Sequence, residues 1–375
     1  MNKKTIQLIW KLTTVAAFVY LFLVSITLMG VSLKGFGAGF TERLLETTSN
    51  PFVGLFIGIL TTSIIQSSST TTSIVVGMVA SGVITISNAI PIVMGANIGT
   101  TATNTIVSLS HITRKEEFKR AITGATVHDF FNITCVAIMF PIELATGFLQ
   151  KAATWLSSLF VNFGGIKFTS PIKTATKPTC ELLTDLCTKN LHLSEKMGYI
   201  TLLLLSVFLI FLSLYMIVKV MKSLVIKQTE TVLDKIIGRH GIIGIIAGLI
   251  FTMIVQSSSI TTALLIPLIG AGILTVELTF PVTLGANIGT TTTAILASFA
   301  TGNSAAITIA FVHFIFNVTG VLIIYPIKIF RLIPIKLAKG LGNLAFKKRR
   351  YAIIYAIGIF YILPTIMILI SRMFN

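Results

Sequence analysis

Two short polar segments carry the residues of this chain that are best suited to binding an ion inside an apolar protein. Gln66-Ser67-Ser68-Ser69 is repeated as Gln256-Ser257-Ser258-Ser259. Each segment offers three hydroxyl groups and one amide, which donate and accept hydrogen bonds without formal charge. Lipid tolerates irregular backbone only where protein or a water-filled cavity covers it. Two such breaks at matching positions of two halves indicate a transporter binding site.

A glycine-bearing motif follows each polar segment. Gly95-Ala96-Asn97-Ile98-Gly99-Thr100-Thr101 recurs as Gly285-Ala286-Asn287-Ile288-Gly289-Thr290-Thr291. Its glycines permit a helix break and a close backbone approach, and its amides and hydroxyls supply neutral oxygens. We expect the substrate to contact Asn97 and Asn287. We expect Thr100 to be a sodium ligand, and Thr290 and Thr293 offer hydroxyl oxygens of the same kind in the second half.

The distribution of charge indicates which ions these segments bind. If the backbone breaks at each Gln-Ser-Ser-Ser segment, the following half-helix presents free N–H groups and a positive dipole end, which favour an anion. The preceding half-helix presents carbonyls, which favour a small hard cation. No Lys or Arg lies between Arg43 and Arg114, or between Arg239 and Lys328. Because an uncompensated buried anion is too costly, anion binding should be coupled to sodium.

Composition places these motifs in a membrane. The chain is 54% hydrophobic and 11% charged with a mean hydropathy of +0.92, whereas a soluble domain has about 25% charged residues. Residues 6–31 are long enough to span a bilayer, unlike a cleavable signal, and long apolar runs argue against an outer-membrane barrel. The net charge of +17 comes largely from loops expected at 114–120, 219–239 and 328–350. That is the positive-inside pattern rather than a nucleic-acid surface.

The fold expected is an all-α polytopic membrane protein with two inverted-topology repeats, 51–149 and 238–334. Each repeat should contain a re-entrant helical hairpin and a broken transmembrane helix. The N-terminus is expected in the cytoplasm. The remaining parts are an N-terminal helix and connector (1–50), an extracellular loop (150–195), a helix and cytoplasmic linker (196–237), and a basic loop with a C-terminal helix (335–375). The membrane-embedded segments expected are 6–31, 53–83, 88–109, 121–149, 197–220, 241–273, 278–300, 305–330 and 351–371.

One carboxylate breaks the symmetry of the repeats. His128-Asp129-Phe130-Phe131-Asn132 pairs with His313-Phe314-Ile315-Phe316-Asn317, so Asp129 stands opposite Phe314. A carboxylate in an apolar segment is by default a functional-site hypothesis. Asp129 is interpreted as a ligand for a further sodium ion or a proton carrier, with a structural hydrogen-bonding role as the alternative. The His and Asn pairs favour structural hydrogen bonds, since no Cys or Glu completes a metal site.

The three cysteines carry less information. Cys135 lies in an apolar segment and is interpreted as a packing residue. Cys180 and Cys187 lie in the tract between the halves, where Thr169 to Cys180 is expected to be an exposed loop. Whether these two form a local disulfide depends on an extracellular location, and the sequence leaves both outcomes open.

The doubled motifs together with His128-Asp129-Phe130-Phe131-Asn132 resemble the type II sodium–phosphate cotransporter family in its compact bacterial form. The resemblance covers both repeats, and implies sodium-driven phosphate uptake across the plasma (inner) membrane. Carried over, phosphate would lie between the segments beginning at Gln66 and Gln256. The resemblance implies that Gln256, Ser257, Thr290 and Thr293 form the sodium sites. It also implies that Asp129 binds an additional sodium ion. The long termini of animal members and the soluble domain of some relatives are not expected here.

Three other function classes are alternatives to sodium–phosphate cotransport. A sodium-coupled carrier of another small anion, such as a dicarboxylate, is the main alternative, and an ion channel is a further one. An enzyme with a serine nucleophile is disfavoured because no base lies near either polar segment, so we expect no enzymatic activity. The partners expected are inorganic phosphate, sodium and membrane lipid, with no nucleic acid and no organic cofactor. The oligomeric state is left open.

Overall fold

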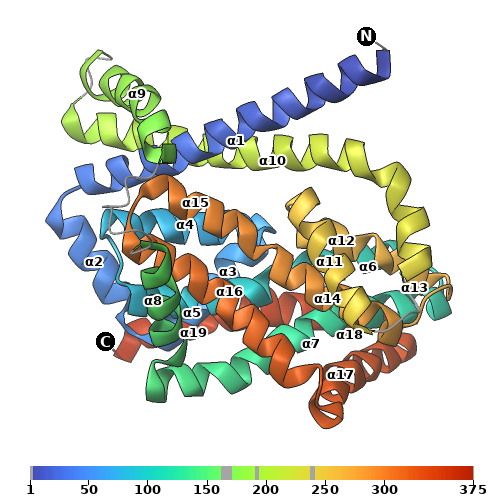
Figure 1. The fold of residues 1–375 in the computed structure, drawn as a ribbon. Helices are drawn as coiled ribbons and strands as arrows, with labels where there is room; N and C mark the ends of the chain where they lie inside the picture. Colours follow the sequence, from blue (N-terminus) through green and yellow to red (C-terminus); the bar gives the residue numbers. More distant parts are fainter. Residues whose placement is uncertain (1–2, 162–170, 191–193, 237–240, 375) are drawn as a thin grey trace.

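The computed structural model describes residues 3–161, 171–190, 194–236 and 241–374. Every regular element in this part of the chain is helical (Figure 1). Five of its helical segments are long and apolar enough to cross a membrane, or six if the sharply bent pair α2–α3 is one span. The expected all-α polytopic membrane protein is therefore confirmed. These segments are α1 (Lys3–Gly35), α7 (Lys115–Thr146), α10 (Glu195–Ile236), α16 (Ser304–Ile324) and the run α18 (Arg350–Ile357), η3 (Gly358–Ile362), α19 (Leu363–Phe374).

The segments that carry the doubled motifs are made of shorter helices. The first polar segment separates α3 (Pro51–Ile65) from α4 (Ser68–Ser81), and the second separates α11 (Gly241–Val255) from α12 (Ser258–Ala263) and α13 (Leu265–Gly270). After the glycine motifs, α5 (Ile86–Gly99) gives way to α6 (Ala102–Ser108), and α14 (Val276–Gly289) to α15 (Thr291–Thr301). Both polar segments and both glycine motifs therefore interrupt helices, as expected.

Glycines explain how each polar segment comes to lie beside its glycine motif. A Cβ on Gly58 of α3 would lie 2.1 Å from the Ile92 carbonyl oxygen of α5, and one on Gly95 would lie 2.0 Å from the Leu55 carbonyl oxygen. The pair α11–α14 repeats this arrangement with Gly248 and Gly285. Only residues without a side chain allow such contact, which is how helices pack closely within a membrane.

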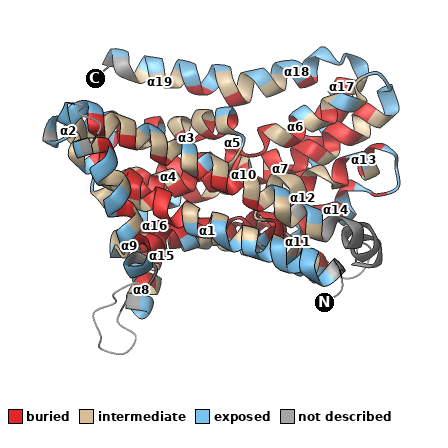
Figure 2. Cartoon of the chain, turned by 90° about the horizontal axis from the view of Figure 1, so that it is seen from above, coloured by how far each residue is buried: buried red, intermediate tan, exposed pale blue. Residues whose placement is uncertain are grey.

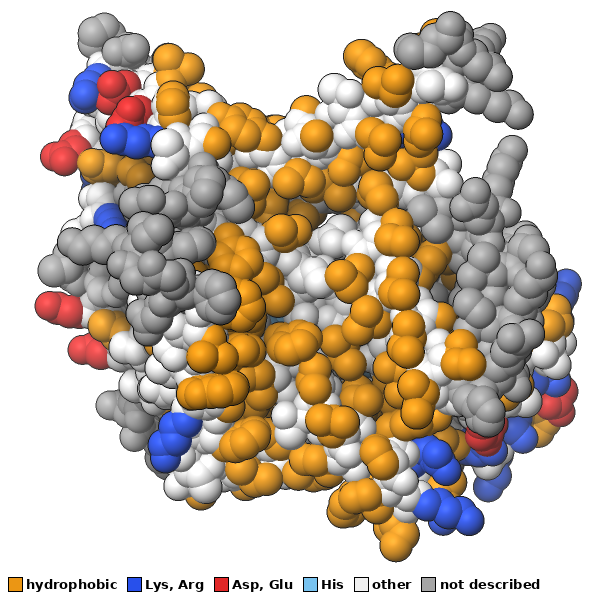
Figure 3. Space-filling model, viewed as in Figure 1, with side chains coloured by type: hydrophobic (Ala, Val, Ile, Leu, Met, Phe, Trp, Pro, Cys, Tyr) orange, Lys and Arg blue, Asp and Glu red, His pale blue; other side chains and the backbone are white. Residues whose placement is uncertain are grey.

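The remaining helices surround this motif-bearing core. α1 and α10 lie side by side across one face, and α16 packs against α4, α5 and α14 (Figure 1). Burial is concentrated in the central helices, while α18 and α19 form a largely exposed edge (Figure 2). Charged side chains gather at the two lateral margins of one face with hydrophobic ones between them (Figure 3). The helices not yet bounded are α2 (Ala38–Ser49), η1 (Leu109–His111), α8 (Phe148–Val161), α9 (Pro171–Asp185), η2 (Leu186–Asn190) and α17 (Lys328–Lys347).

Five stretches expected to be loops are helical. Residues 115–120 begin α7, and residues 150–161 belong to α8. Residues 171–190 form α9 and η2, residues 219–236 continue α10, and α17 occupies most of 328–350. The loop predicted from the basic residues of 328–350 is wrong because α17 also has a buried apolar side, including Ile335 and Leu341. This side of the helix packs against α7. Thr169 and Ser170 lie outside the described residues.

Cys180 and Cys187 are not linked to each other. Both thiols are free and lie in an apolar cluster with Val24 and Leu28 of α1 and Leu202 of α10. The question left open by the sequence is thereby answered against a disulfide. Cys135 is buried in the main core, as expected.

Candidate functional site

Each polar segment forms a tight turn between two helices. Gln66 and Gln256 are the two non-glycine residues with positive φ in the described chain, at 58° and 59°. Each ends its helix through its backbone N–H, which donates to a threonine carbonyl four residues earlier at 2.6 and 2.7 Å. The next helix then begins at once, with Ser67 and Ser257 accepting N–H bonds as N-caps at 3.2 and 3.3 Å. Serine is a preferred N-cap residue, so the local sequence favours this turn.

Both turns open into one cavity of about 240 Å³. The N-termini of α4 and α12 meet there, and each brings the N–H groups that a helix leaves without a partner and the positive end of its dipole. None of the described residues lining the cavity is Lys, Arg, Asp, Glu or His. The cavity can therefore receive an anion only through neutral donors and dipoles. The lining residues are Ile65, Gln66, Ser67, Ser68, Ser69, Thr70, Thr100, Phe211, Leu214, Tyr215, Val218, Gln256, Ser257, Ser258, Ser259 and Thr290.

Threonines of the glycine motifs connect the two polar segments. Thr290 donates to the Ser258 hydroxyl at 3.2 Å and lies 3.5 Å from the Ser69 hydroxyl, so it joins residues of both repeats. Thr100 is the corresponding residue of the first motif, and its hydroxyl accepts from the Ser68 N–H at 3.4 Å. These contacts link hydroxyl groups of both repeats within the cavity wall.

The Gln256 side chain has a second role at the edge of this wall. Its Oε1 accepts from Thr293 at 2.6 Å, and its Nε2 donates to Thr292 at 3.2 Å. Gln256 and Thr293, which the family resemblance assigns to sodium, are thus in direct contact, while Thr290 contacts Ser258. Thr293 itself does not line the cavity.

Asn97 and Asn287, expected to contact the substrate, lie elsewhere. Asn287 Nδ2 donates to Asn132 Oδ1 at 2.8 Å and to Asn317 Oδ1 at 2.7 Å, while its Oδ1 lies 3.0 Å from His128 Nε2. These side chains are all buried, and neither Asn97 nor Asn287 lines the cavity. The structure therefore gives both asparagines hydrogen bonds within the protein.

In the first repeat, the Asn97 side chain makes fewer contacts with other helices than the Asn287 side chain does. His313 Nε2 lies 3.3 Å from Asn97 Oδ1, and Asn132 Nδ2 donates to the Asn97 main-chain carbonyl. Each histidine thus pairs with the asparagine of the opposite glycine motif. The interpretation of the His and Asn pairs as structural groups agrees with these contacts.

Asp129 is fully buried and separate from the cavity. Its Oδ2 accepts from Thr105 at 3.1 Å and from Tyr355 at 3.2 Å, while Oδ1 has no hydrogen-bond partner among the described residues. No group of three or more His, Cys, Asp or Glu side chains is placed to hold a metal in this part of the chain. Any cation at Asp129 would therefore rely on neutral oxygens as its other ligands.

Sequence reasoning missed one helix that lines the cavity. Phe211, Leu214, Tyr215 and Val218 of α10 line it, and their spacing places them on one face of a helix. That spacing was the available signal, but α10 lies outside both repeats. Tyr355, the partner of Asp129, was also missed.

Comparison with known proteins agrees with this architecture. Residues 21–169 and 209–368 match the family described as Na+/Pi-cotransporter. The chain is 36% identical to sodium-dependent phosphate transport protein 2B of Pongo abelii and of Homo sapiens, covering 96% of this chain and 65% of each relative. It is 35% identical to protein 2A of Rattus norvegicus, over 96% of this chain and 68% of that protein. The chain thus spans about two thirds of the length of these relatives. No solved structure matches it. The chain belongs to the Na+/Pi-cotransporter family.

Proposed function

We propose that this protein couples the entry of sodium to the uptake of inorganic phosphate. The observation that carries the proposal is the cavity shared by both Gln-Ser-Ser-Ser segments. Hydroxyls and helix N-termini suit a small oxyanion, and the relatives are named as sodium-dependent phosphate transport proteins. Phosphate binds between the two turns, to Gln66, Ser67, Ser68 and Ser69 on one side and Gln256, Ser257, Ser258 and Ser259 on the other.

Sodium supplies the positive charge that the cavity wall lacks. Gln256, Ser257, Thr290 and Thr293, with Thr100 in the first repeat, provide oxygens suited to a hard cation. Sodium bound there offsets the cost of desolvating the anion, so each ligand strengthens the site of the other. Asp129 holds a further sodium ion, supported by its unpartnered Oδ1.

Transport proceeds by alternating access. Residues 51–149 and 238–334 act as inverted repeats whose broken helices and hairpins move around the substrate. The equivalent glycine contacts in α3–α5 and α11–α14 support the view that each hairpin and its neighbouring helix move as one unit. The protein lies in the plasma (inner) membrane with its N-terminus in the cytoplasm.

Uptake of labelled phosphate into proteoliposomes tests this proposal. A sodium gradient should drive uptake, while potassium or proton gradients of equal size should not. Ser258→Ala should abolish uptake with folding retained. Ser298→Ala is the matched control, because Ser298 is equally buried but bonds only within its own helix, at 2.7 Å. Wild-type uptake by Ser258→Ala would contradict the assignment, and stronger inhibition by succinate than by unlabelled phosphate would favour a dicarboxylate carrier.

A further inference from the structure

A second cavity, of about 390 Å³, lies away from the proposed transport site. It is bounded by the start of α7, the turn between α13 and α14, and α17, at one lateral end of the molecule (Figure 1). The side chains that carry charge on its wall are Lys119, Arg120, Lys339 and Glu277. Three cations face one carboxylate, so the cavity has an excess of positive charge.

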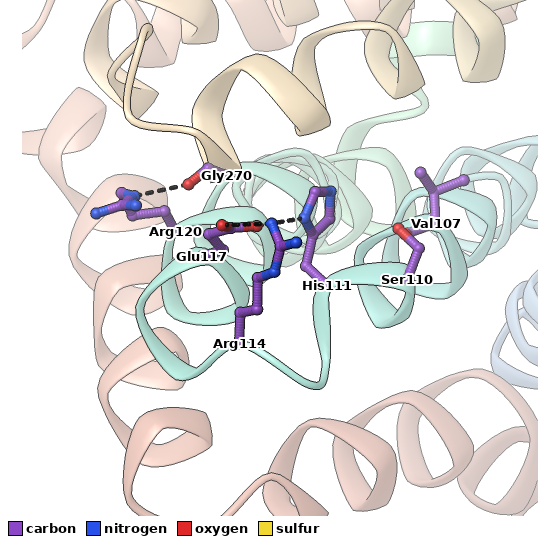
Figure 4. Close-up of polar contacts among 7 residues, drawn as sticks. All are labelled: Val107, Ser110, His111, Arg114, Glu117, Arg120 and Gly270. Atoms are coloured by element: carbon purple, nitrogen blue, oxygen red, sulfur yellow. Dashed lines mark hydrogen bonds and ion pairs between the residues drawn. The ribbon is translucent and has the colours of Figure 1, made fainter.

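Two of these cations lack an acidic partner in the described chain. Lys339 is paired with Glu277, whereas Lys119 has a ring contact instead, with its Nζ 5.4 Å from the centroid of Phe346. Arg120 donates through Nε to the Gly270 carbonyl at 2.8 Å (Figure 4). This uses one of the five N–H donors of a guanidinium group. Both side chains are half-buried.

The neighbouring carboxylate of Glu117 does not compensate them. Its two oxygens are taken by Arg114 at 2.9 Å and His111 at 3.4 Å (Figure 4). The N-terminus of α14, capped by Thr275, adds the positive end of a helix dipole to the cavity wall. The unused donors and the dipole together suit a phosphate group, which accepts several charge-assisted hydrogen bonds.

Apolar side chains beside the cavity indicate what carries that phosphate. Ile273 and Leu278 flank the α13–α14 turn, and Leu344 lies next to the lining residue Asn343; all three are exposed. The same elements lie at the margin where charged side chains meet the hydrophobic face (Figure 3). A phospholipid joins a headgroup phosphate to apolar acyl chains, which matches a basic cavity with exposed apolar side chains beside it.

We propose that this cavity binds the headgroup of an anionic phospholipid. Lys119, Arg120 and Lys339 contact the headgroup phosphate, and Ile273, Leu278 and Leu344 contact the acyl chains. Basic pockets between membrane helices recognise anionic headgroups in this way. The lipid would also lie beside the Arg120–Gly270 hydrogen bond, which joins the end of α13 to α7. This inference concerns a site distinct from the transport cavity and does not depend on the transported ion.

Binding is tested on the purified full chain after delipidation. Phosphatidylglycerol or phosphatidylcholine is added back, and lipid retention is measured by native mass spectrometry beside the midpoint of thermal unfolding. Phosphatidylglycerol should be retained and should raise the midpoint more than phosphatidylcholine does. Lys119→Gln should weaken its retention about tenfold, as expected for one charge-assisted hydrogen bond. Lys336→Gln is the matched control, because Lys336 is an exposed lysine of α17 that does not line the cavity.

A second variant guards against a folding defect in Lys119→Gln. Glu277→Gln with Lys339→Gln keeps the net charge of the cavity while removing one ammonium donor, so it should weaken retention less than Lys119→Gln. Unchanged retention in both variants, or equal loss in Lys336→Gln, would overturn the proposal. Displacement of phosphatidylglycerol by millimolar inorganic phosphate or glycerol 3-phosphate would assign the cavity to a free phosphate instead.

Discussion

The buried amide network makes Asn287 the most informative residue to change. Asn287→Ala removes two donated bonds, to Asn132 and Asn317, and one bond accepted from His128. The Asn287 amide nitrogen is the donor in the first two contacts, so its oxygen faces His128 and the imidazole Nε2 carries the proton. Removing the amide leaves three buried polar atoms without their partner.

The expected loss of stability follows from these three contacts. A buried polar group left unsatisfied costs about 1–3 kcal/mol, so Asn287→Ala should lower the free energy of unfolding by at least about 3 kcal/mol. Asn97→Ala should cost less. The Asn97 side chain makes one bond to another helix, with His313 at 3.3 Å, and one within its own helix, to Val93. The bond from Asn132 to the Asn97 main chain would survive.

Thermal unfolding in detergent, followed by size-exclusion fluorescence, measures this order. The midpoint should fall most in Asn287→Ala, less in Asn97→Ala, and not at all in Lys336→Ala, whose side chain is exposed on α17 outside both cavities. The reasoning would be refuted if Asn287→Ala unfolded like the wild type yet lost phosphate binding. That result would return Asn287 to the substrate site.

Three further predictions concern packing, the isolated carboxylate and the thiols. Gly58→Ala should lower the unfolding midpoint, since its Cβ would meet the Ile92 backbone and overpacking costs about 1–3 kcal/mol; Gly340→Ala, with open space around it, should not. Asp129→Asn should reduce the charge moved per transport cycle, and an unchanged transport current and sodium Hill coefficient would count against a sodium at this residue. A maleimide should label Cys180 and Cys187 only after unfolding, because both are buried; rapid labelling of the folded protein would contradict their position.

Much of the fold was predictable because the relevant signals are local. The length of the apolar segments predicts membrane helices. The tight turns at Gln66 and Gln256 are formed by adjacent residues, a Gln with positive φ followed by a serine N-cap. The repetition of these motifs with equal spacing also predicted that both would serve one site. The extent of the helices at the basic ends was less predictable, because α17 is helical through its packing against α7 rather than through its charges.

The sequence by itself determined which residues are polar within apolar surroundings, and that Asp129 stands without a counterpart. Only the tertiary structure decided where the asparagines point. Asn97 and Asn287 share their motif with Thr100 and Thr290, yet the asparagines lie within α5 and α14, whereas each threonine lies beyond the last residue of its helix, where the helix is interrupted. The threonines therefore reach the cavity, whereas the asparagines reach His313 and His128 of the opposite repeat. Such contacts between helices distant in sequence leave no local pattern, and the same is true of the Tyr355 hydroxyl that donates to Asp129.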